Sequence, residues 1–168
     1  MPTPPAFPAA FAAPVLRFED GMRMHYVPLP DDVADRLDAE GARRVVGTLN
    51  DQPISRGVQR TKDGVRFLLF GREAMRALGI GYGDTAVLEL APDPAPDQVD
   101  LGPELEAALD EDPEAAARFA TFTPGRRRSL AYYVTSAKRP ATRERRAAEL
   151  AEKLRTFTLY GDLHPDRR

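Results

Sequence analysis

Ten basic residues and three acidic ones fall between residues 124 and 155, and a block with this charge can bind anions. Its first group is a run of three arginines, residues 126–128, directly after a Thr123-Pro124 pair that predicts the start of a helix. A helix N-terminus already carries partial positive charge, so these arginines do not stabilise the helix. We therefore expect another contact to explain them.

The second basic group lies where one predicted helix ends and the next begins, with Thr142 expected to cap the second helix and leave free N–H groups beside it. Two tyrosines nearby offer a stacking surface. We predict that these side chains converge on one corner of a helical hairpin that binds phosphate or carboxylate groups. The candidate ligand-binding residues are Tyr132, Tyr133, Lys138, Arg139, Thr142, Arg143 and Arg146.

An acidic run precedes the basic block, with nine acidic residues and no basic one from Asp93 to Glu114. The whole chain has 24 Lys and Arg, 26 Asp and Glu, and a formal net charge of −2. Three explanations of the basic block compete. The acidic run neutralises it, with Arg143 as a partly buried ion-pair partner; or it binds an anionic small molecule, a lipid head group, a protein or nucleic acid; or it is a solvated face. The near-neutral net charge makes nucleic acid the weaker partner.

Catalytic chemistry has few candidate residues in this chain. No cysteine is present, which excludes thiolate nucleophiles, zinc ribbons and iron–sulfur clusters, and two histidines cannot build a three-His metal site. His25 lies in a predicted strand and His164 in a polar tail, so neither is placed as a triad base. Residues 79–84 read as a helix stop and a turn rather than a phosphate loop. We predict no catalytic residue, no metal and no cofactor, and a protein that is not an enzyme; an uncharacterised enzyme is the alternative.

The N-terminal half reads as a β-rich unit. From Pro14 to about Asp93 the apolar residues recur mostly with period two, and the pairs Asp20-Gly21 and Asp63-Gly64 predict hairpin turns. Two short helices are expected, from Asp31 to Gly41 and over residues 72–79. Six short strands with two short helices favour a closed or partly closed barrel, because closure hides the strand edges.

Beyond a Pro-rich linker the period changes to 3.6, and X-Pro pairs mark the helix starts. We therefore expect an α+β protein. Its parts are a disordered Pro/Ala-rich tail (1–13), a β-barrel domain (14–93), a Pro-rich acidic linker (94–103), a small helical module (104–156) and a second tail (157–168). The first 14 residues have no Lys or Arg and contain five prolines, unlike a signal peptide, and no apolar run is long enough to cross a membrane. A cytoplasmic location is expected.

The helical module resembles the YdeI/OmpD-associated family, also called bacteriocin-protection proteins. The resemblance rests on FATFTPGRRR (residues 119–128) and on the run from Ser129 to Leu154, which contains YVTSAK and TRERR. Tyr133 stands where the family usually has Trp. Ala141 stands where a Glu precedes the Thr, which weakens any catalytic or ion-pair role at that position.

The barrel segment is similar to the uncharacterised domain often fused ahead of this module, through residues 45–54 and 72–90. That resemblance implies a double-split, six-stranded barrel related in shape to the swapped-hairpin barrels of AbrB and MazE. The family name implies a bacterial role in stress or antimicrobial-peptide resistance and attaches no reaction to the fold. We expect a non-enzymatic binding protein; the alternative is a nucleic-acid-binding regulator that uses the barrel as AbrB-like folds do. Because swapped-hairpin barrels often dimerise, the oligomeric state stays open.

Overall fold

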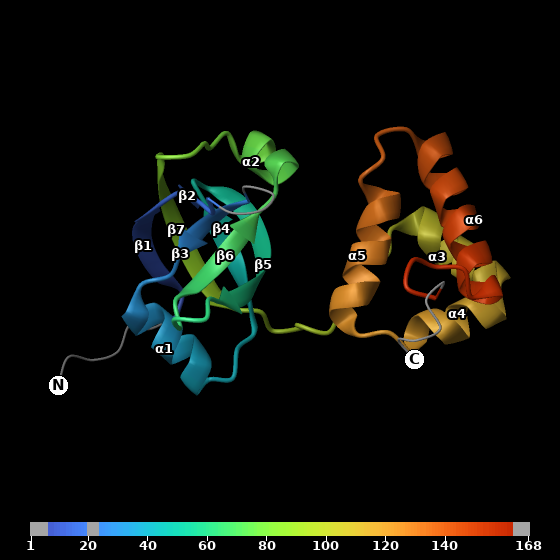
Figure 1. Cartoon of the computed structure of the whole chain (residues 1–168), viewed down its shortest axis with the longest axis horizontal. Helices are drawn as coiled ribbons and strands as arrows, with labels where there is room; N and C mark the ends of the chain where they lie inside the picture. Colours follow the sequence, from blue (N-terminus) through green and yellow to red (C-terminus); the bar gives the residue numbers. More distant parts are fainter. Residues whose placement is uncertain (1–6, 20–23, 163–168) are drawn as a thin grey trace. The chain divides into compact units, whose positions relative to one another are not determined.

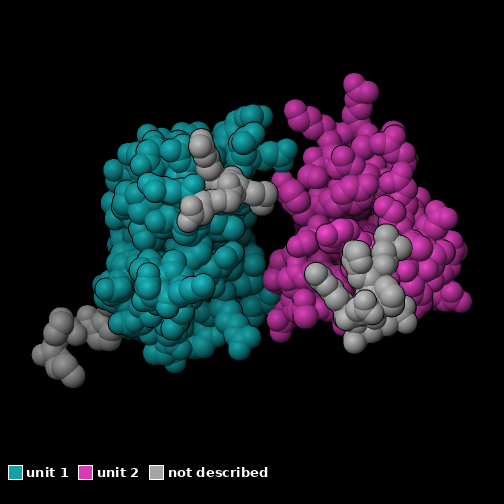
Figure 2. All heavy atoms as spheres, in the orientation of Figure 1, with its two compact units in different colours: residues 1–96 teal, residues 97–168 magenta. Residues whose placement is uncertain are grey.

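The computed structural model describes residues 7–19 and 24–162, and the chain divides into two compact units, residues 1–96 and 97–168 (Figure 2). The first unit is a nearly closed antiparallel β-barrel with two short helices, and the second is helical (Figure 1). The α+β class and the order of barrel and helical module are confirmed. No helix in the described ranges is long and apolar enough to cross a membrane.

Seven strands form the barrel. They are β1 (Ala9–Pro14), β2 (Leu16–Arg17), β3 (His25–Pro28), β4 (Arg44–Leu49), β5 (Gln52–Arg60), β6 (Arg66–Phe70) and β7 (Thr85–Pro92), in the spatial order β1-β7-β4-β5-β6-β3-β2. The two strands at the ends of this order are joined by one residue, Val15, so the sheet has to curl until its edges approach each other. Val15 is fully buried, and its backbone bonds to Gly83 and Asp84 hold this junction against the start of β7.

The predicted tail over residues 1–13 is wrong for residues 9–13, which lie in β1, and β1 raises the predicted strand count from six to seven. This strand pairs with β7 from Ala9↔Leu90 to Pro14↔Thr85. Proline and alanine have low strand propensity, so the composition of this segment did not predict a strand. Small side chains nevertheless suit the position, because Ala9 and Ala13 are buried against the barrel core.

Hairpin turns account for the sharp reversals of the barrel. The β5–β6 hairpin turns at Asp63-Gly64 as predicted. The β4–β5 turn is centred on Asn50 and Asp51, both at positive φ (48° and 64°), as a two-residue type I′ turn requires. Strands β2 and β3 pair antiparallel as expected, but the Asp20-Gly21 pair lies outside the described residues.

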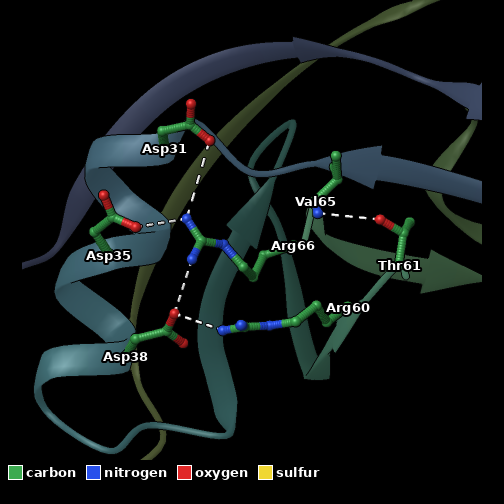
Figure 3. Close-up of polar contacts among 7 residues, drawn as sticks. All are labelled: Asp31, Asp35, Asp38, Arg60, Thr61, Val65 and Arg66. Atoms are coloured by element: carbon green, nitrogen blue, oxygen red, sulfur yellow. Dashed lines mark hydrogen bonds and ion pairs between the residues drawn. The ribbon is translucent and has the colours of Figure 1, made fainter. Parts of the chain in front are cut away.

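Helices α1 (Asp31–Ala39) and α2 (Arg72–Leu78) agree with the predicted positions. Arg66 of β6 ties α1 to the barrel through ion pairs with Asp35 (2.6 Å) and Asp38 (2.9 Å), and Asp38 also binds Arg60 (Figure 3). The hydrogen bond with Asp35 is the main cause of a raised pKa of the Arg66 guanidinium. This polar cluster is a helix-docking contact, because its cations and carboxylates bind each other.

Four helices build the second unit: α3 (Pro103–Glu111), α4 (Pro113–Ala120), α5 (Pro124–Thr135) and α6 (Pro140–Thr156). Each begins with proline, whose missing N–H would be unbonded in the first turn anyway. Asp112 caps α4 and Thr123 caps α5, as the X-Pro pairs predicted. The helices enclose a separate apolar core that includes Leu105, Val134 and Leu154.

The predicted tail over residues 157–168 is wrong for residues 157–162. Leu159 is buried in the core of the helical unit, and Asp162 binds Arg118 of α4. Phe157, Leu159 and Tyr160 form a stretch too short to give a periodic signal, so the sequence pattern did not reveal this return of the chain. Residues 163–168 lie outside the described part.

The close approach of β4 and β7 depends on Gly47. A Cβ built on Gly47 would overlap the carbonyl oxygen of Glu89, and the residue has φ of 155°. Gly47→Ala is therefore expected to lower the free energy of unfolding by about 2 kcal/mol or more, because backbone would have to move. Urea denaturation followed by circular dichroism measures this. The matched control is Gly57→Ala on β5, where the new Cβ meets Arg44 at an ordinary 3.6 Å; equal losses in both variants would contradict the prediction.

Candidate functional site

The seven predicted site residues all lie on the hairpin formed by α5, α6 and their connection. Tyr132 and Tyr133 belong to the last turn of α5, and Lys138 and Arg139 to the connection. The other three, Thr142, Arg143 and Arg146, lie in the first two turns of α6. The corner thus exists, and the contacts of each side chain determine what it is free to bind.

Arg143 is committed to contacts within the protein. Its Nε donates to Glu104 of α3 (2.7 Å), and its Nη1 donates to the carbonyl oxygens of Ala137 and Lys138 (3.1 Å each). One guanidinium therefore joins α3, α6 and the connection that follows α5. The alternative considered for Arg143, a partly buried structural ion pair, describes it correctly.

Arg146 and Tyr133 contact each other, and Tyr133 also contacts Glu149. The Nη1 of Arg146 donates to the carbonyl oxygen of Tyr133 (2.8 Å), and its guanidinium lies 4.9 Å from the centre of the Tyr133 ring. The Tyr133 hydroxyl in turn donates to Glu149 (3.3 Å). These contacts stabilise the packing of α6 on α5.

The expected cap at Thr142 is wrong. Helix α6 begins at Pro140 with Arg139 as its N-cap residue, and no side chain caps it. The N–H groups of Thr142 and Arg143 both donate to the carbonyl of Arg139, so they are not free to bind a ligand. Proline is favoured at the first helical position, and Pro140 moves the helix start ahead of Thr142.

Lys138 and Arg139 are the cations of the corner that remain available. Both are exposed, and neither forms an ion pair or side-chain hydrogen bond with any residue in the described ranges. They adjoin the uncapped start of α6, whose first turn has no acidic residue. Charge and helix dipole therefore act in the same direction at this point.

The acidic run neutralises the basic block only in part. Arg143 binds Glu104, and Arg155 binds Asp112 at 3.6 Å. Asp93, the first residue of the run, binds Arg44 of the barrel instead. These two pairs in the described part of the chain involve two of the ten basic residues, so they do not support the explanation in which the run occupies most of the block.

A second group of contacts lies at the other end of α5, and the sequence analysis did not predict it. Arg126 lies over the ring of Phe122 (4.1 Å), and Arg118 lies over Phe122 (5.5 Å) and Phe157 (4.0 Å). We call these four side chains the Arg–Phe stack. The spacing of four between residues 118, 122 and 126 was a signal that could have found three of them, but a helix break intervenes, and Phe157 is distant in sequence.

Arg118 anchors this stack. Its Nη2 donates to Asp162 (2.6 Å) and its Nη1 to the carbonyl of Leu154 (3.2 Å). The hydrogen bond from Arg118, helped by one from the Leu159 N–H, holds the pKa of the Asp162 carboxyl below its usual range against the effect of burial. Because its N–H groups are engaged, Arg118 contributes structure rather than a free cation.

A shallow groove of about 610 Å³ lies between α3 and α6. Its lining combines small side chains, Ala107, Ala108 and Ala148, with the carboxylates of Glu104, Glu111 and Glu144. Three carboxylates repel anions, so this groove does not suit the ligand class predicted for the basic corner.

Comparison with protein families agrees with this division. Residues 98–156 match the family described as Bacteriocin-protection, YdeI or OmpD-Associated. The helical unit belongs to this family. Residues 11–90 match a domain of unknown function, DUF1905, which covers the barrel. No curated protein matches the chain in sequence. Both resemblances seen in the sequence are thereby confirmed, and the YdeI/OmpD-associated domain contains the whole predicted corner.

Arg143 should matter for the stability of the YdeI/OmpD-associated domain. Arg143→Ala removes the donors of two carbonyl oxygens, and we expect a loss of about 1–2 kcal/mol in the free energy of unfolding from these bonds alone. Thermal melting followed by circular dichroism measures it. Arg145→Ala is the control, since Arg145 is exposed with a long contact to Glu149 (3.9 Å); a similar loss there would contradict a special role for Arg143.

Acid should weaken the same contact. The hydrogen bond from Arg143 lowers the pKa of Glu104 from its ordinary 4.5. A depressed carboxyl pKa stabilises the fold above 4.5, and this stabilisation is lost as pH falls through the lower value of the folded state. Melting temperatures between about pH 7 and pH 3 should therefore fall more steeply in the wild type than in Glu104→Gln. Parallel curves for the two proteins would contradict the assignment.

Proposed function

We propose that this protein is a non-enzymatic binding protein that takes an anionic partner at the tip of the α5–α6 hairpin. The observation that carries the proposal is the pair Lys138 and Arg139, two adjacent exposed cations at an uncapped helix start. Local structure gives no reason for two cations at the positive end of a helix. Binding a negatively charged group would offset that cost.

Arg143 and Arg146 act in this proposal as positioning residues. They fix the connection between the helices through bonds to the carbonyl oxygens of Ala137, Lys138 and Tyr133. A connection held in this way presents its two free cations in one conformation, so less conformational entropy is lost when a ligand binds. Tyr132 and Tyr133, which are 58% and 41% exposed, supply an aromatic surface on the same helix.

The shared chemistry of the partner is a phosphate or carboxylate group, either on a small molecule, a protein or a lipid surface. Lys binds such groups as a compact charge, and the guanidinium of Arg139 adds planar donors that match two oxygens. The name of the matched family motivates the further proposal that this binding serves stress or bacteriocin resistance in the bacterial cytoplasm.

Two probes test the proposal and distinguish the sources of the anion. Inorganic phosphate titrated into ¹⁵N-labelled full-length protein should shift the amide signals of Lys138, Arg139 and Ala141. Vesicles of phosphatidylglycerol, compared with phosphatidylcholine, should sediment the protein if the anion belongs to a membrane surface. The variant Lys138→Ala/Arg139→Ala should weaken whichever binding is seen by about tenfold, because both free charges are removed.

The double variant should keep its melting temperature, because neither side chain has a partner in the described residues. Arg145→Ala controls for loss of charge nearby, since Arg145 is 69% exposed on the same helix. Equal weakening in Arg145→Ala would indicate nonspecific attraction. Absence of binding to both probes, or undiminished binding by the double variant, would overturn the proposed site.

A further inference from the structure

Two side chains of the Arg–Phe stack, Arg118 and Phe122, are at least partly buried, and the other two, Arg126 and Phe157, are exposed. Arg118 is 13% exposed, and its in-plane donors are bonded to Asp162 and to the Leu154 carbonyl. Arg126 and Phe157 are exposed at the surface. The hydrogen bonds of Arg118 explain how the stack is held in place. They do not explain why Arg126 and Phe157 are exposed at the surface.

Phe157 contacts the Arg118 guanidinium at 4.0 Å, but that contact leaves more than half of the residue exposed. It is the C-cap of α6 in the left-handed region, with φ of 56°, and its residue surface is 57% exposed. Glycine or asparagine is the usual choice there, because a β-carbon in this conformation costs free energy and an exposed ring recovers little of it by burial. A strained, exposed aromatic residue is the kind of outlier that indicates a functional use.

Arg126 offers hydrogen-bond donors beside this exposed ring. The central carbon of its guanidinium lies 4.1 Å from the centre of the Phe122 ring, a cation–π contact that uses none of its five N–H donors in a hydrogen bond. Within residues 7–19 and 24–162, these donors bond to no acceptor and form no ion pair. The contact with Phe122 therefore keeps the guanidinium beside the ring while its N–H donors remain available.

The charge around the stack favours an anion. Asp162 is bonded to Arg118 (2.6 Å) and also interacts with the charge of Arg126, so two arginines face this one carboxylate. The first turn of α5 contains no acidic residue, and Lys153 lies one turn before Phe157. A partner must then combine planar rings, which stack on Phe157, with negative charge, which the Arg126 edge binds. Single-stranded nucleic acid has both at short intervals.

We propose that the Arg–Phe stack is a binding platform for single-stranded nucleic acid, with a base stacked on Phe157 and a phosphate held by Arg126. This site is separate from the hairpin tip, because the two cation groups lie at opposite ends of the 12-residue helix α5, about 18 Å apart along its axis. It also differs from recognition by the barrel, since all four side chains belong to the helical unit.

Fluorescence anisotropy with a labelled oligothymidylate of about 12 nucleotides tests the proposal on the full chain. The wild type should bind at about 50 mM salt, with log affinity falling by about 0.7 per log unit of salt for each phosphate bound. Phe157→Gly should weaken binding about tenfold, while the melting temperature changes little, because the preference of glycine for the left-handed position offsets the lost contact with Arg118. Arg126→Gln should weaken binding and reduce the salt slope by about 0.7.

Two controls make the test specific. Tyr82→Ala removes an aromatic residue of similar exposure (60%) that also lies beneath an arginine, Arg17 at 4.7 Å, but in the barrel, and it should leave binding unchanged. Arg145→Ala removes an exposed charge that belongs to neither proposed site and should leave binding unchanged. Inorganic phosphate and vesicles test the hairpin tip, whereas Phe157→Gly and Arg126→Gln test the Arg–Phe stack, so failure of one proposal is distinguishable from failure of the other. No wild-type binding at low salt, wild-type affinity in both Phe157→Gly and Arg126→Gln, or loss only in the Lys138/Arg139 variant would overturn the proposal.

Discussion

The helical unit depends on arginine side chains that supply hydrogen bonds to carbonyl oxygens near the ends of α5 and α6. The last carbonyls of a helix have no partner within it, and buried backbone groups need one. Arg146 reaches back from α6 to the carbonyl of Tyr133 in the last turn of α5, and Arg143 to those of Ala137 and Lys138 in the connection. Arg118 of α4 does the same for Leu154 of α6.

This constraint divides the basic block into engaged and available cations. Arg143 and Arg146 have their donors committed to backbone and to Glu104, whereas Lys138, Arg139 and Arg126 keep theirs exposed. A block that looks continuous in sequence therefore becomes two patches at the two ends of α5. Each patch adjoins aromatic side chains, but the hairpin tip offers compact charge, and the Arg–Phe stack offers a planar surface.

Local signals in the sequence were sufficient for most of the elements. The Asp63-Gly64 pair placed a hairpin, and Asp112-Pro113 and Thr123-Pro124 placed two helix starts, because the turn or cap is determined by residues next to each other. Strand β1 was missed for the opposite reason. Its stability comes from pairing with β7, some 75 residues later, and not from the strand propensity of its own residues, most of which are alanine.

The sequence by itself determined the two-part architecture, the family of the helical unit and the presence of a dense basic block beside an acidic one. Only the tertiary structure decided which basic residues are free. Arg143 meets Glu104 across 39 positions, and Arg118 meets Leu154 across 36 and Asp162 across 44. No local rule encodes such pairings, because the donor and acceptor come together only when helices distant in sequence pack on one core.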